Sequence, residues 1–353
     1  MTLSLTRADD PATTTIGDRS VIVHYGDPAG EYGALRIGGM LVDRSYRHRL
    51  RVSGTRALET LAGLVTNDVQ SLPPGRGQYA AALTPKGRIV ADVRVFVRTE
   101  TEAWIDAPPR AAAGWMGVMR RYVNPRLARV EEIGEATADL GVFGPRAAAI
   151  AAAALDLDPA ALDALDRYAH LPIGDSGLVA RVPDLGVDGF EMIVPADDGP
   201  RRWQAMVDAG ARPGGLAAWD IARVEAGRPE WGLDIDDTTI PQEANFDDLQ
   251  AISYTKGCYT GQEVVARVHF RGHVNRHLRG LRFVCRDIPP RGAQIFGEGD
   301  KPVGDLRTAA LSPRLGGVAL AMIRREIPLG ATVSIRWEGG ECQGGVAALP
   351  LPL

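Results

Sequence analysis

Cysteine is scarce in this chain, with three residues among 353, at positions 258, 285 and 342. They are widely spaced, include no Cys-x-x-Cys pair and make an odd total, so the sequence predicts neither a set of disulfides nor a structural zinc site. Such a composition suits a reducing compartment. The three thiols are then either inert core residues or, in one case, a reactive group.

A basic excess and long apolar runs are missing as well. The 40 Lys and Arg residues are outnumbered by 44 Asp and Glu residues, which gives a formal net charge of −4. Nucleic-acid-binding proteins usually carry a basic excess or stripe, so any RNA contact would have to be local. No run approaches the roughly 18 apolar residues of a membrane span. The N-terminus lacks the basic stretch followed by an apolar stretch that marks a secretion signal. We therefore expect a cytoplasmic protein that makes no membrane contact.

The length of the chain predicts two or three domains, because a single hydrophobic core usually stops growing at about 250 to 300 residues. The polar residues 1–20 predict a flexible arm. After Arg276 the sequence changes to short apolar strands with frequent Gly and Pro, which predicts a small barrel or sandwich. Mixed helix and strand patterns before that point place the chain in the α+β class.

Several local patterns predict individual elements. Residues 41–52 alternate apolar and polar residues as a half-buried strand does, and residues 54–64 have helical spacing. The sequence TPKG at 84–87 is typical of a turn between two strands. An Ala-rich stretch at 146–168 predicts a helix broken near Pro159. The strand at 41–52 would present five basic side chains on a solvated edge: Arg44, Arg47, His48, Arg49 and Arg51.

The densest cluster of unusual residues is the segment YTKGCYTGQE. Thr260 and Glu263 have the S/T-x-x-E spacing of a capping box, so a helix should begin at about Gly261. Cys258 then lies just before a helix N-terminus, with Lys256 two residues away, and both features favour the thiolate over the thiol. One interpretation is a reactive cysteine. The alternative is a small buried residue in a Gly-flanked turn, followed by an ordinary helix cap.

The motif KGCYTGQE, followed by VVARVHFRGHVNR, strongly resembles the signature of the YgfZ family and its mitochondrial iron-sulfur assembly relatives. Other stretches resemble the glycine cleavage T-protein superfamily at large, including LTPKGRIVADVRV, VDGFEMIVP and ARVEAGRPEWGLDI. The resemblance implies a T-protein-like multidomain α+β body over residues 21–274, built from two intertwined subdomains that divide near residue 140. It also implies a small C-terminal β-barrel over residues 275–353.

The resemblance also implies a ligand, because the body of T-proteins surrounds a central opening that binds tetrahydrofolate. Asp92 in IVADV, Glu191 in DGFE and Arg223 in ARVEAG align with the acidic and basic residues that contact folate in that superfamily. A pterin ring offers N–H groups to a carboxylate, and the glutamate tail offers carboxylates to an arginine. Each residue also has a plain structural interpretation, as a strand-end acid, an exposed strand residue or a helix-surface ion-pair partner.

Within the motif, the resemblance implies that Cys258 and Lys256 form the working centre. Tyr259, Gln262 and Glu263 are implied to lie beside the bound tetrahydrofolate or folate derivative. Cys258 would attack an electrophile, take part in redox chemistry or transiently ligate iron or sulfur, and the sequence does not choose between these roles.

The function implied is that of a folate-binding accessory protein for iron-sulfur cluster assembly or repair and for iron-sulfur-dependent tRNA modification. Its partners would be iron-sulfur enzymes or assembly factors. The alternative is a folate-dependent aminomethyltransferase of the T-protein type. T-proteins have paired acids where this chain has Ala91 and Asp92. The missing acid weakens the case for aminomethyl transfer more than the case for folate binding, because proton transfer during methylene transfer would depend on such acids.

A concentrated basic region follows the motif at residues 267–279. On an extended chain its odd-numbered members would share one side and could hold a phosphate, a folate tail or, weakly, tRNA. A three-histidine metal site is disfavoured by Gly272 and by the lack of a completing carboxylate, so no metal is expected. A solvated basic face is the default. The members are Arg267, His269, Arg271, His273, Arg276, His277 and Arg279.

Overall fold

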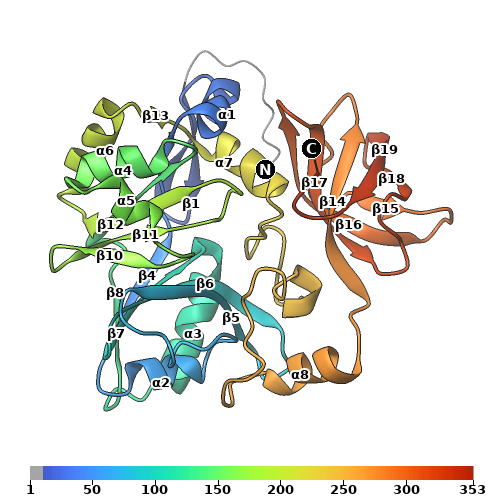
Figure 1. Ribbon diagram of the computed structural model, residues 1–353. Helices are drawn as coiled ribbons and strands as arrows, with labels where there is room; N and C mark the ends of the chain where they lie inside the picture. The colour runs from blue at the N-terminus through green and yellow to red at the C-terminus, as the bar shows by residue number, and fades with distance from the viewer. Residues whose placement is uncertain (1–10, 353) are drawn as a thin grey trace.

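The computed structural model describes residues 11–352, which form an α+β body of two mixed layers and a closed β-barrel beside it (Figure 1). The first body sheet has six strands in the order β10-β11-β12-β9-β3-β13. Its strands are β10 (His170–Ile173), β11 (Gly177–Arg181), β12 (Gly189–Pro195), β9 (Thr137–Phe143), β3 (Met40–Asp43) and β13 (Arg212–Pro213).

The second body sheet has five antiparallel strands in the order β5-β6-β7-β4-β8. The predicted turn at 84–87 joins β5 to β6, and Gly87 there has a φ of 71°, which favours glycine. The hairpin prediction is therefore confirmed. The strands are β5 (Arg76–Leu83), β6 (Ile89–Thr99), β7 (Glu102–Ala107), β4 (His48–Ser53) and β8 (Arg129–Glu132).

Helices cover the outer faces of both body sheets. The Ala-rich stretch forms two helices as predicted, because Asp156 adopts a left-handed conformation and Pro159 opens the second helix. The body helices are α1 (Pro28–Ile37), α2 (Ala57–Ala62), η1 (Pro109–Ala111), α3 (Ala112–Tyr122), α4 (Ala147–Leu155), α5 (Pro159–Asp163), α6 (Gly199–Asp208) and α7 (Leu216–Glu225). None of the helices in residues 11–352 is long and apolar enough to cross a membrane.

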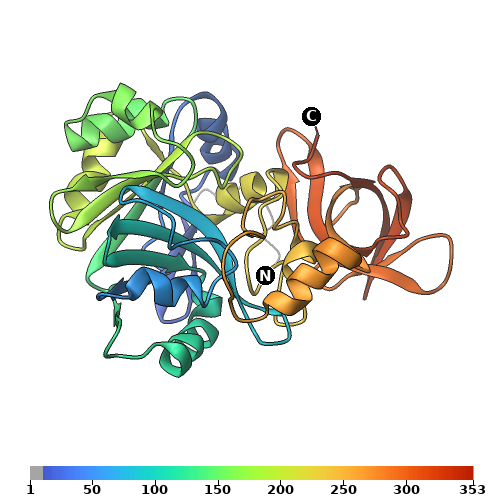
Figure 2. The ribbon, with the colours of Figure 1, turned by 60° about the horizontal axis from the view of Figure 1, so that its bottom comes forward.

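The C-terminal part of the chain closes into a six-stranded barrel, which confirms the barrel form of the prediction (Figure 2). Alternate residues point inward and fill it, among them Leu281, Ile295, Leu306 and Ile335. Helices η2 (Pro241–Ala244) and α8 (Gln262–Arg271) precede it. Its strands are β14 (Arg276–Val284), β17 (Gly316–Arg324), β16 (Pro302–Ser312), β15 (Gln294–Phe296), β18 (Thr332–Trp337) and β19 (Gly340–Ala347).

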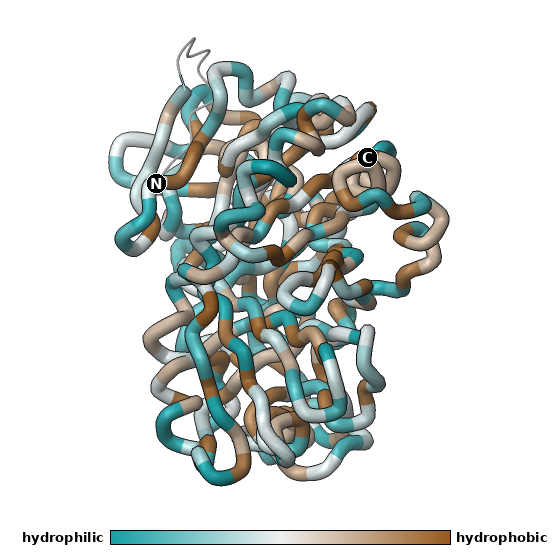
Figure 3. The backbone as a smooth tube through the Cα atoms, turned by 90° about the vertical axis from the view of Figure 1, so that its left-hand side faces the viewer, coloured by the Kyte–Doolittle hydropathy of each residue, from teal (hydrophilic) through white to brown (hydrophobic). Residues whose placement is uncertain are grey.

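Helix α7 joins the body to the barrel. Its Glu225 is buried and accepts hydrogen bonds from the Tyr32 hydroxyl of α1 and the Ser312 hydroxyl at the end of β16. Arg314 also contacts this carboxylate, at 3.0 Å. Hydrophobic and hydrophilic segments alternate along the whole tube in Figure 3. One apolar core continues from α7 into the barrel wall. The barrel is therefore packed on the body.

The arm predicted for residues 1–20 is partly ordered. Strand β1 (Ala12–Ile16) pairs with β2 (Arg19–His24) in a two-stranded sheet. Residues 1–10 lie outside the described residues. The arm prediction is therefore wrong for residues 12–20, where three consecutive Thr residues, which favour strands, lie in β1.

Residues 41–52 are two strands rather than the single strand predicted from their alternation. β3 belongs to the first sheet and β4 to the second, and the chain passes from one sheet to the other between them. The predicted exposed basic edge is wrong for Arg44, Arg47 and Arg49, which are at most 7% exposed. Alternation cannot distinguish a solvated face from one that faces a second layer of charged side chains.

The prediction of free thiols is wrong for two of the three cysteines. Cys285 and Cys342 form a disulfide, with their Cα atoms 5.5 Å apart. Because Val284 of β14 pairs with Gln343 of β19, the antiparallel register places these cysteines directly opposite each other. A separation of 57 residues gives no sequence signal for such a pair.

Candidate functional site

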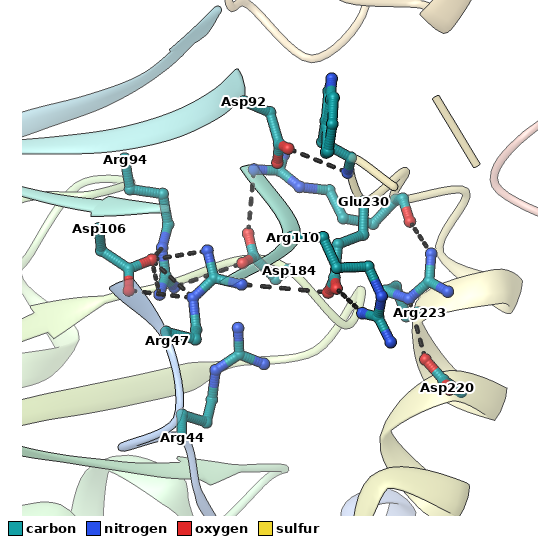
Figure 4. A network of polar contacts seen from close by, with 12 residues as sticks. Arg44, Arg47, Asp92, Arg94, Asp106, Arg110, Asp184, Asp220, Arg223 and Glu230 are labelled. Atoms are coloured by element: carbon teal, nitrogen blue, oxygen red, sulfur yellow. Dashed lines mark hydrogen bonds and ion pairs between the residues drawn. The ribbon is translucent and has the colours of Figure 1, made fainter. Parts of the chain in front are cut away.

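Charged side chains gather where the two body sheets face each other, and we call this group the buried charge cluster (Figure 4). They lie on otherwise apolar strands and on the connections between the sheets. Burying a charge is costly unless it is paired, so each of these groups must find partners inside the protein. The members are Arg44, Arg47, Arg49, Asp92, Arg94, Asp106, Asp139, Asp184, Glu191 and Arg228.

Asp106 of β7 is fully buried at the centre of the cluster. Arg94 lies opposite it on β6 and contacts its carboxylate through Nη2 at 2.6 Å. Arg47 contacts the same carboxylate at 2.7 Å from the β3–β4 connection. Burial raises the pKa of Asp106, but the two guanidinium groups outweigh burial and lower the pKa overall. Asp106 is therefore ionised at neutral pH.

Arg94 connects the two sheets. Besides Asp106, it contacts Glu191 of β12 at 2.7 Å and Asp184 at 3.4 Å. Glu191 also contacts Arg44 at 3.2 Å, and the Arg44 guanidinium lies 3.6 Å from the centre of the Trp219 ring of α7. One arginine thus serves three carboxylates from distant segments.

Asp139 of β9 lies on the same face of the first sheet as Glu191. Burial and the charge of Glu191 raise the pKa of Asp139 to about 7, although Arg49 is 3.8 Å away. Six buried atoms of this corner make no hydrogen bond within residues 11–352, although ion pairs hold their side chains: Nε and Nη1 of Arg44, both carboxylate oxygens of Asp139 and both of Glu191. Buried polar atoms are normally satisfied, so a water or a ligand is the expected partner.

Asp92 of β6 lies on another side of the cluster. Its carboxylate accepts hydrogen bonds at 3.0 Å from the Tyr79 hydroxyl and from the backbone N–H of Trp231. Burial raises the pKa of Asp92 to about 6 despite the nearby Arg47. Asp92 can therefore exchange a proton near neutral pH.

A cavity of about 330 Å³ reaches this side of the cluster and is lined by Arg228 and Asp184. The Arg228 guanidinium lies 3.5 Å from the centre of the Tyr79 ring, contacts Asp184 at 3.3 Å and donates to the Tyr168 hydroxyl at 2.9 Å. A solvent-reachable cavity is thus connected to Asp92 through Arg228 and Tyr79.

Arg223 lies beyond the cluster, where α7 meets the barrel. Its guanidinium pairs with Asp234 and, at 3.2 Å, with Asp220. Thr308 of β16 donates to the other Asp234 oxygen at 2.6 Å. Arg223 is therefore committed to buried partners that attach the barrel. It touches the cluster by donating to the backbone carbonyl oxygen of Arg228 at 2.8 Å.

The segment 253–260, which we call the motif loop, carries Cys258 at the surface. Lys256 points back into the protein, where its ammonium group donates to the carbonyl oxygens of Ala62, Val65 and Asn67, the last two at 2.7 and 2.8 Å. Burial lowers the pKa of Lys256 to about 8. Lys256 is thus a clamp that holds the motif loop on the end of α2.

The helix after the motif begins where predicted, but without the predicted capping box. Gly261 occupies the cap position with a φ of 83°, and no side chain caps the helix. A Cβ on Gly261 would lie 2.6 Å from the carbonyl oxygen of Thr84, so only glycine fits. Of the three motif residues implied as ligand contacts, Tyr259 is buried in the core, Gln262 is half-buried and Glu263 is exposed.

The structure brings Asp92 and Glu191 into one cluster but does not bring the motif residues to it. Within residues 11–352, no hydrogen bond or ion pair joins Lys256, Cys258 or Glu263 to the cluster. The connection is indirect: Thr66, next to the Lys256 clamp, accepts a hydrogen bond from Ala81, which pairs with Asp92 across β5 and β6.

The basic region 267–279 is not one extended segment, so its odd-numbered members do not share one side. Residues 267–271 continue helix α8, so Arg267 and Arg271 share a helix face that His269 does not. His269 stacks on the Tyr254 ring with centroids 3.6 Å apart. Arg276 begins β14 and pairs with Glu243 at 3.0 Å.

Most of the cluster was missed at the sequence level. Arg94 and Asp106 stand within long apolar strands, in VADVRVFV and AWIDA, and a charge in such a strand is a signal of buried pairing. Tyr79, Tyr168 and Arg228 carry no comparable signal.

Comparison with known proteins identifies relatives over nearly the whole chain. A family profile described as GCVT N-terminal domain matches residues 26–252, and one described as glycine cleavage T-protein C-terminal barrel domain matches residues 276–351. A protein named aminomethyltransferase from Nostoc sp. strain PCC 7120 is 30% identical over 316 residues, covering 88% of this chain and 83% of the relative. A Bacillus subtilis protein of the same name is 30% identical over 321 residues, covering 89% and 87%.

The fold also has a solved counterpart. The crystal structure of glycine cleavage system aminomethyltransferase T from Bartonella henselae superposes with a TM-score of 0.87. It is 22% identical and covers 98% of this chain and 95% of its own. This similarity shows a shared fold, including the barrel.

Proposed function

The chain belongs to the glycine cleavage T-protein family, and from that membership we propose that it binds tetrahydrofolate at the buried charge cluster. Members of this family use tetrahydrofolate. The observation that carries the proposal is a set of buried atoms on Arg44, Asp139 and Glu191 that make ion pairs but no hydrogen bonds within residues 11–352. They lie beside Asp92, which is linked through Tyr79 and Arg228 to a cavity. Such a set of donors and acceptors fits a polar heterocycle.

In this proposal Asp92 and Glu191 accept the N–H groups of the pterin ring. The Tyr79 ring, on which Arg228 stacks, forms part of the wall of the ligand site. Bound tetrahydrofolate would supply amine nitrogens that carry one-carbon groups. Asp92 would hold or release a proton at its carboxylate, since its pKa of about 6 lies close to neutral pH. Arg223 would fix the barrel on α7 through Asp234 rather than contact the ligand.

Asp92 gives the binding proposal a pH test. Its carboxylate must be ionised to accept pterin N–H groups, so the affinity for tetrahydrofolate should fall as pH drops below about 6. Isothermal titration between pH 5 and pH 8 measures this. An affinity that rises toward pH 5 would rule out Asp92 as the acceptor.

For the cellular role we propose a folate-binding accessory protein of the YgfZ type, which supports iron-sulfur cluster assembly or repair and iron-sulfur-dependent tRNA modification in the cytoplasm. The exposed free thiol of Cys258, held at the surface by the Lys256 clamp, supports this role because a partner protein can reach it. Buried Ala91 beside Asp92, in place of a second acid, also favours an accessory role over transfer chemistry.

The role is tested in a strain that lacks the gene. Wild-type protein should restore iron-sulfur enzyme activities, and Cys258→Ala should fail to do so although it is produced at the same level. A Thr255→Ala variant alters another exposed side chain of the motif loop and serves as the matched control. Full restoration by Cys258→Ala would contradict the role given to the thiol.

A second candidate is aminomethyl transfer, which the names of the relatives at about 30% identity favour. Purified protein is incubated with tetrahydrofolate and an aminomethyl-loaded lipoyl carrier. Rapid formation of methylene-tetrahydrofolate would identify a transferase. Its absence, together with tetrahydrofolate binding, would support the accessory role.

A further inference from the structure

The disulfide between Cys285 and Cys342 lies at one end of the seam that closes the barrel. Strands β14 and β19 form this seam, and their last pair at that end is Val284 with Gln343. The two cysteines come one position beyond that pair, and both are half-buried at the edge of the barrel core. Disulfides that are partly open to solvent are the more readily reduced ones.

The chain leaves the sheet at Cys285. Residues 285–292, which we call the barrel loop, contain no helix or strand. The disulfide fixes the first residue of this loop on β19, and a hydrogen bond from the Gly292 N–H to the carbonyl oxygen of Leu306, at 2.8 Å, fixes the last. Ends of secondary structure open more easily than the middle. Without the disulfide, the start of the barrel loop is therefore free to separate from β19.

The barrel loop also contacts the body beside the buried charge cluster. Its exposed Arg291 donates from Nη1 to the carbonyl oxygen of Gly232 at 2.8 Å. The residue before Gly232 is Trp231, whose backbone N–H donates to the Asp92 carboxylate at 3.0 Å. Two hydrogen bonds on neighbouring residues thus connect the barrel loop to Asp92.

The setting of this disulfide points to a regulatory use. The proposed function places the protein in the cytoplasm, where the disulfides that do form are usually catalytic or redox-sensing. The barrel does not depend on the bond for its closure, because the seam keeps five residue pairs and buried apolar side chains such as Leu281 and Ile335 fill the interior. Opening the bond should therefore loosen the barrel loop and leave the barrel folded.

We propose that Cys285 and Cys342 form a reversible redox switch that controls how firmly the barrel loop holds Trp231 beside Asp92. In the oxidised state, the disulfide keeps Arg291 on the Gly232 carbonyl. In the reduced state the loop moves away, because a single exposed hydrogen bond stabilises it only weakly. The effect of the switch on tetrahydrofolate affinity rests on the proposed function.

Reduction of the switch takes two electrons from a dithiol. A thiolate of the dithiol attacks one sulfur of the pair, the S–S bond breaks, and the departing cysteine thiolate takes a proton. The second thiol of the donor then attacks the mixed disulfide, which frees the other cysteine and leaves the donor as a disulfide. Hydrogen peroxide reverses the change. One cysteine thiolate attacks the O–O bond to give a sulfenic acid, the other cysteine displaces water from that sulfur, and two water molecules form in all.

The test is amide hydrogen exchange on the full chain, first oxidised and then reduced with dithiothreitol in the absence of denaturant. Four amides that donate hydrogen bonds in or beside the barrel loop report on it: Trp231, Gly232, Gly292 and Ala293. Reduction should speed their exchange by roughly tenfold, about the effect of losing one hydrogen bond of local stability. The paired amides in the middle of β16 and β17 should exchange as before.

A pair of variants separates the contact with the body from the disulfide itself. Arg291→Ala should speed exchange at Trp231 and Gly232 in the oxidised protein, and reduction should add nothing further at these two amides. Arg286→Ala changes another exposed arginine of the barrel loop and should respond to reduction as the wild type does. Under the proposed function, oxidised wild type should bind tetrahydrofolate roughly threefold to tenfold more tightly than reduced wild type.

Three results would overturn the switch. They are a disulfide that dithiothreitol opens only in denaturant, faster exchange throughout the barrel after reduction, and unchanged exchange at Trp231 and Gly232. Equal affinity of the two redox states for tetrahydrofolate would overturn the effect on the ligand. If neither state bound tetrahydrofolate, the proposed function would fail, and the exchange measurement would still decide the switch because it uses no ligand.

Discussion

The buried charge cluster and the motif loop differ in how their charged groups are paired and in how exposed their functional groups are. In the cluster, Arg94 contacts three carboxylates, and residues from both sheets are held in a nearly closed interior. In the motif loop, the ammonium group of Lys256 is fixed by backbone carbonyls, while Cys258 is a free thiol exposed at the surface. Under the proposed function, the cluster holds a ligand inside the protein and the loop presents the Cys258 thiol outside it.

This difference separates the two proposed roles, folate binding and thiol chemistry, which the sequence motif had placed at one site. The motif implied that Cys258 and Lys256 work beside bound folate. The structure gives the interior to acids and arginines from distant segments and gives the thiol an outward position. The proposed ligand binding and the proposed thiol chemistry should therefore be separable by mutation, and the following predictions test that separation.

The largest expected effect comes from removing a charge inside the cluster. Arg94→Met leaves Asp106, Asp184 and Glu191 without their shared partner. Breaking a buried ion pair from one side typically costs about 3 to 5 kcal/mol. Urea unfolding at pH 7 should show a loss of this size. Arg267→Met removes an exposed arginine and should change stability by less than ~0.5 kcal/mol. Equal effects would contradict a paired interior.

A pH-dependent effect should follow from Asp139. Burial and Glu191 raise its pKa from the ordinary 3.8 to about 7 in the folded protein. The folded state therefore holds a proton that the unfolded state has lost, and stability declines as pH rises through this range, by at most ~1.4 kcal/mol per pH unit. Asp139→Asn removes this decline.

Urea unfolding at pH 5 and pH 7.5 measures the effect. The stability of Asp139→Asn relative to wild type should increase between these two values. Asp175→Asn, at an exposed position, should show no such change. A parallel pH dependence in wild type and Asp139→Asn would mean that Asp139 does not carry the raised pKa.

A smaller effect is expected from the clamp of the motif loop. Lys256→Met removes three hydrogen bonds from a charged donor and should destabilise the protein by about 1 to 3 kcal/mol. Chemical unfolding is the measurement, and Lys86→Met at an exposed turn is the control. Affinity for tetrahydrofolate should stay within about threefold of wild type, because the clamp lies outside the cluster. A large loss of affinity without destabilisation would place Lys256 in the ligand site.

The smallest structural effect should come from Cys258→Ala, which is expected to change stability by less than ~0.5 kcal/mol because the side chain is exposed. Titration with an aromatic disulfide reagent should count one reactive thiol in the native wild type and none in Cys258→Ala. Three reactive thiols in the wild type would mean that Cys285 and Cys342 are not joined.

Local features of the fold could be predicted from the sequence, but the cluster could not. The turn at 84–87, the helix break near Pro159 and the start of α8 each depend on a few neighbouring residues. Arg44, Arg47 and Arg49 were misassigned to a solvated edge because alternation shows that a strand has two faces, not what covers each face. Carboxylate partners such as Asp106 and Glu191 lie 59 to 147 positions further along the chain, so only tertiary structure reveals the pairing.

The same limit applies to the candidate site. Asp92 and Glu191 were found through family motifs, and the structure brings both to one cluster. Lys256 was assigned to the working centre through the family motif and its spacing from Cys258, but neither reports side-chain direction. The disulfide was missed because its two halves meet only through the register of β14 and β19.

The central claim is that tetrahydrofolate binds at the buried charge cluster and that the thiol lies outside that site. The most direct measurement is a titration of tetrahydrofolate into wild type, Asp92→Asn and Cys258→Ala at pH 7.5. Losing charge-assisted hydrogen bonds to Asp92 should weaken binding by roughly 10- to 100-fold, whereas Cys258→Ala should bind as the wild type does. Unchanged binding by Asp92→Asn, or a comparable loss in Cys258→Ala, would contradict the account.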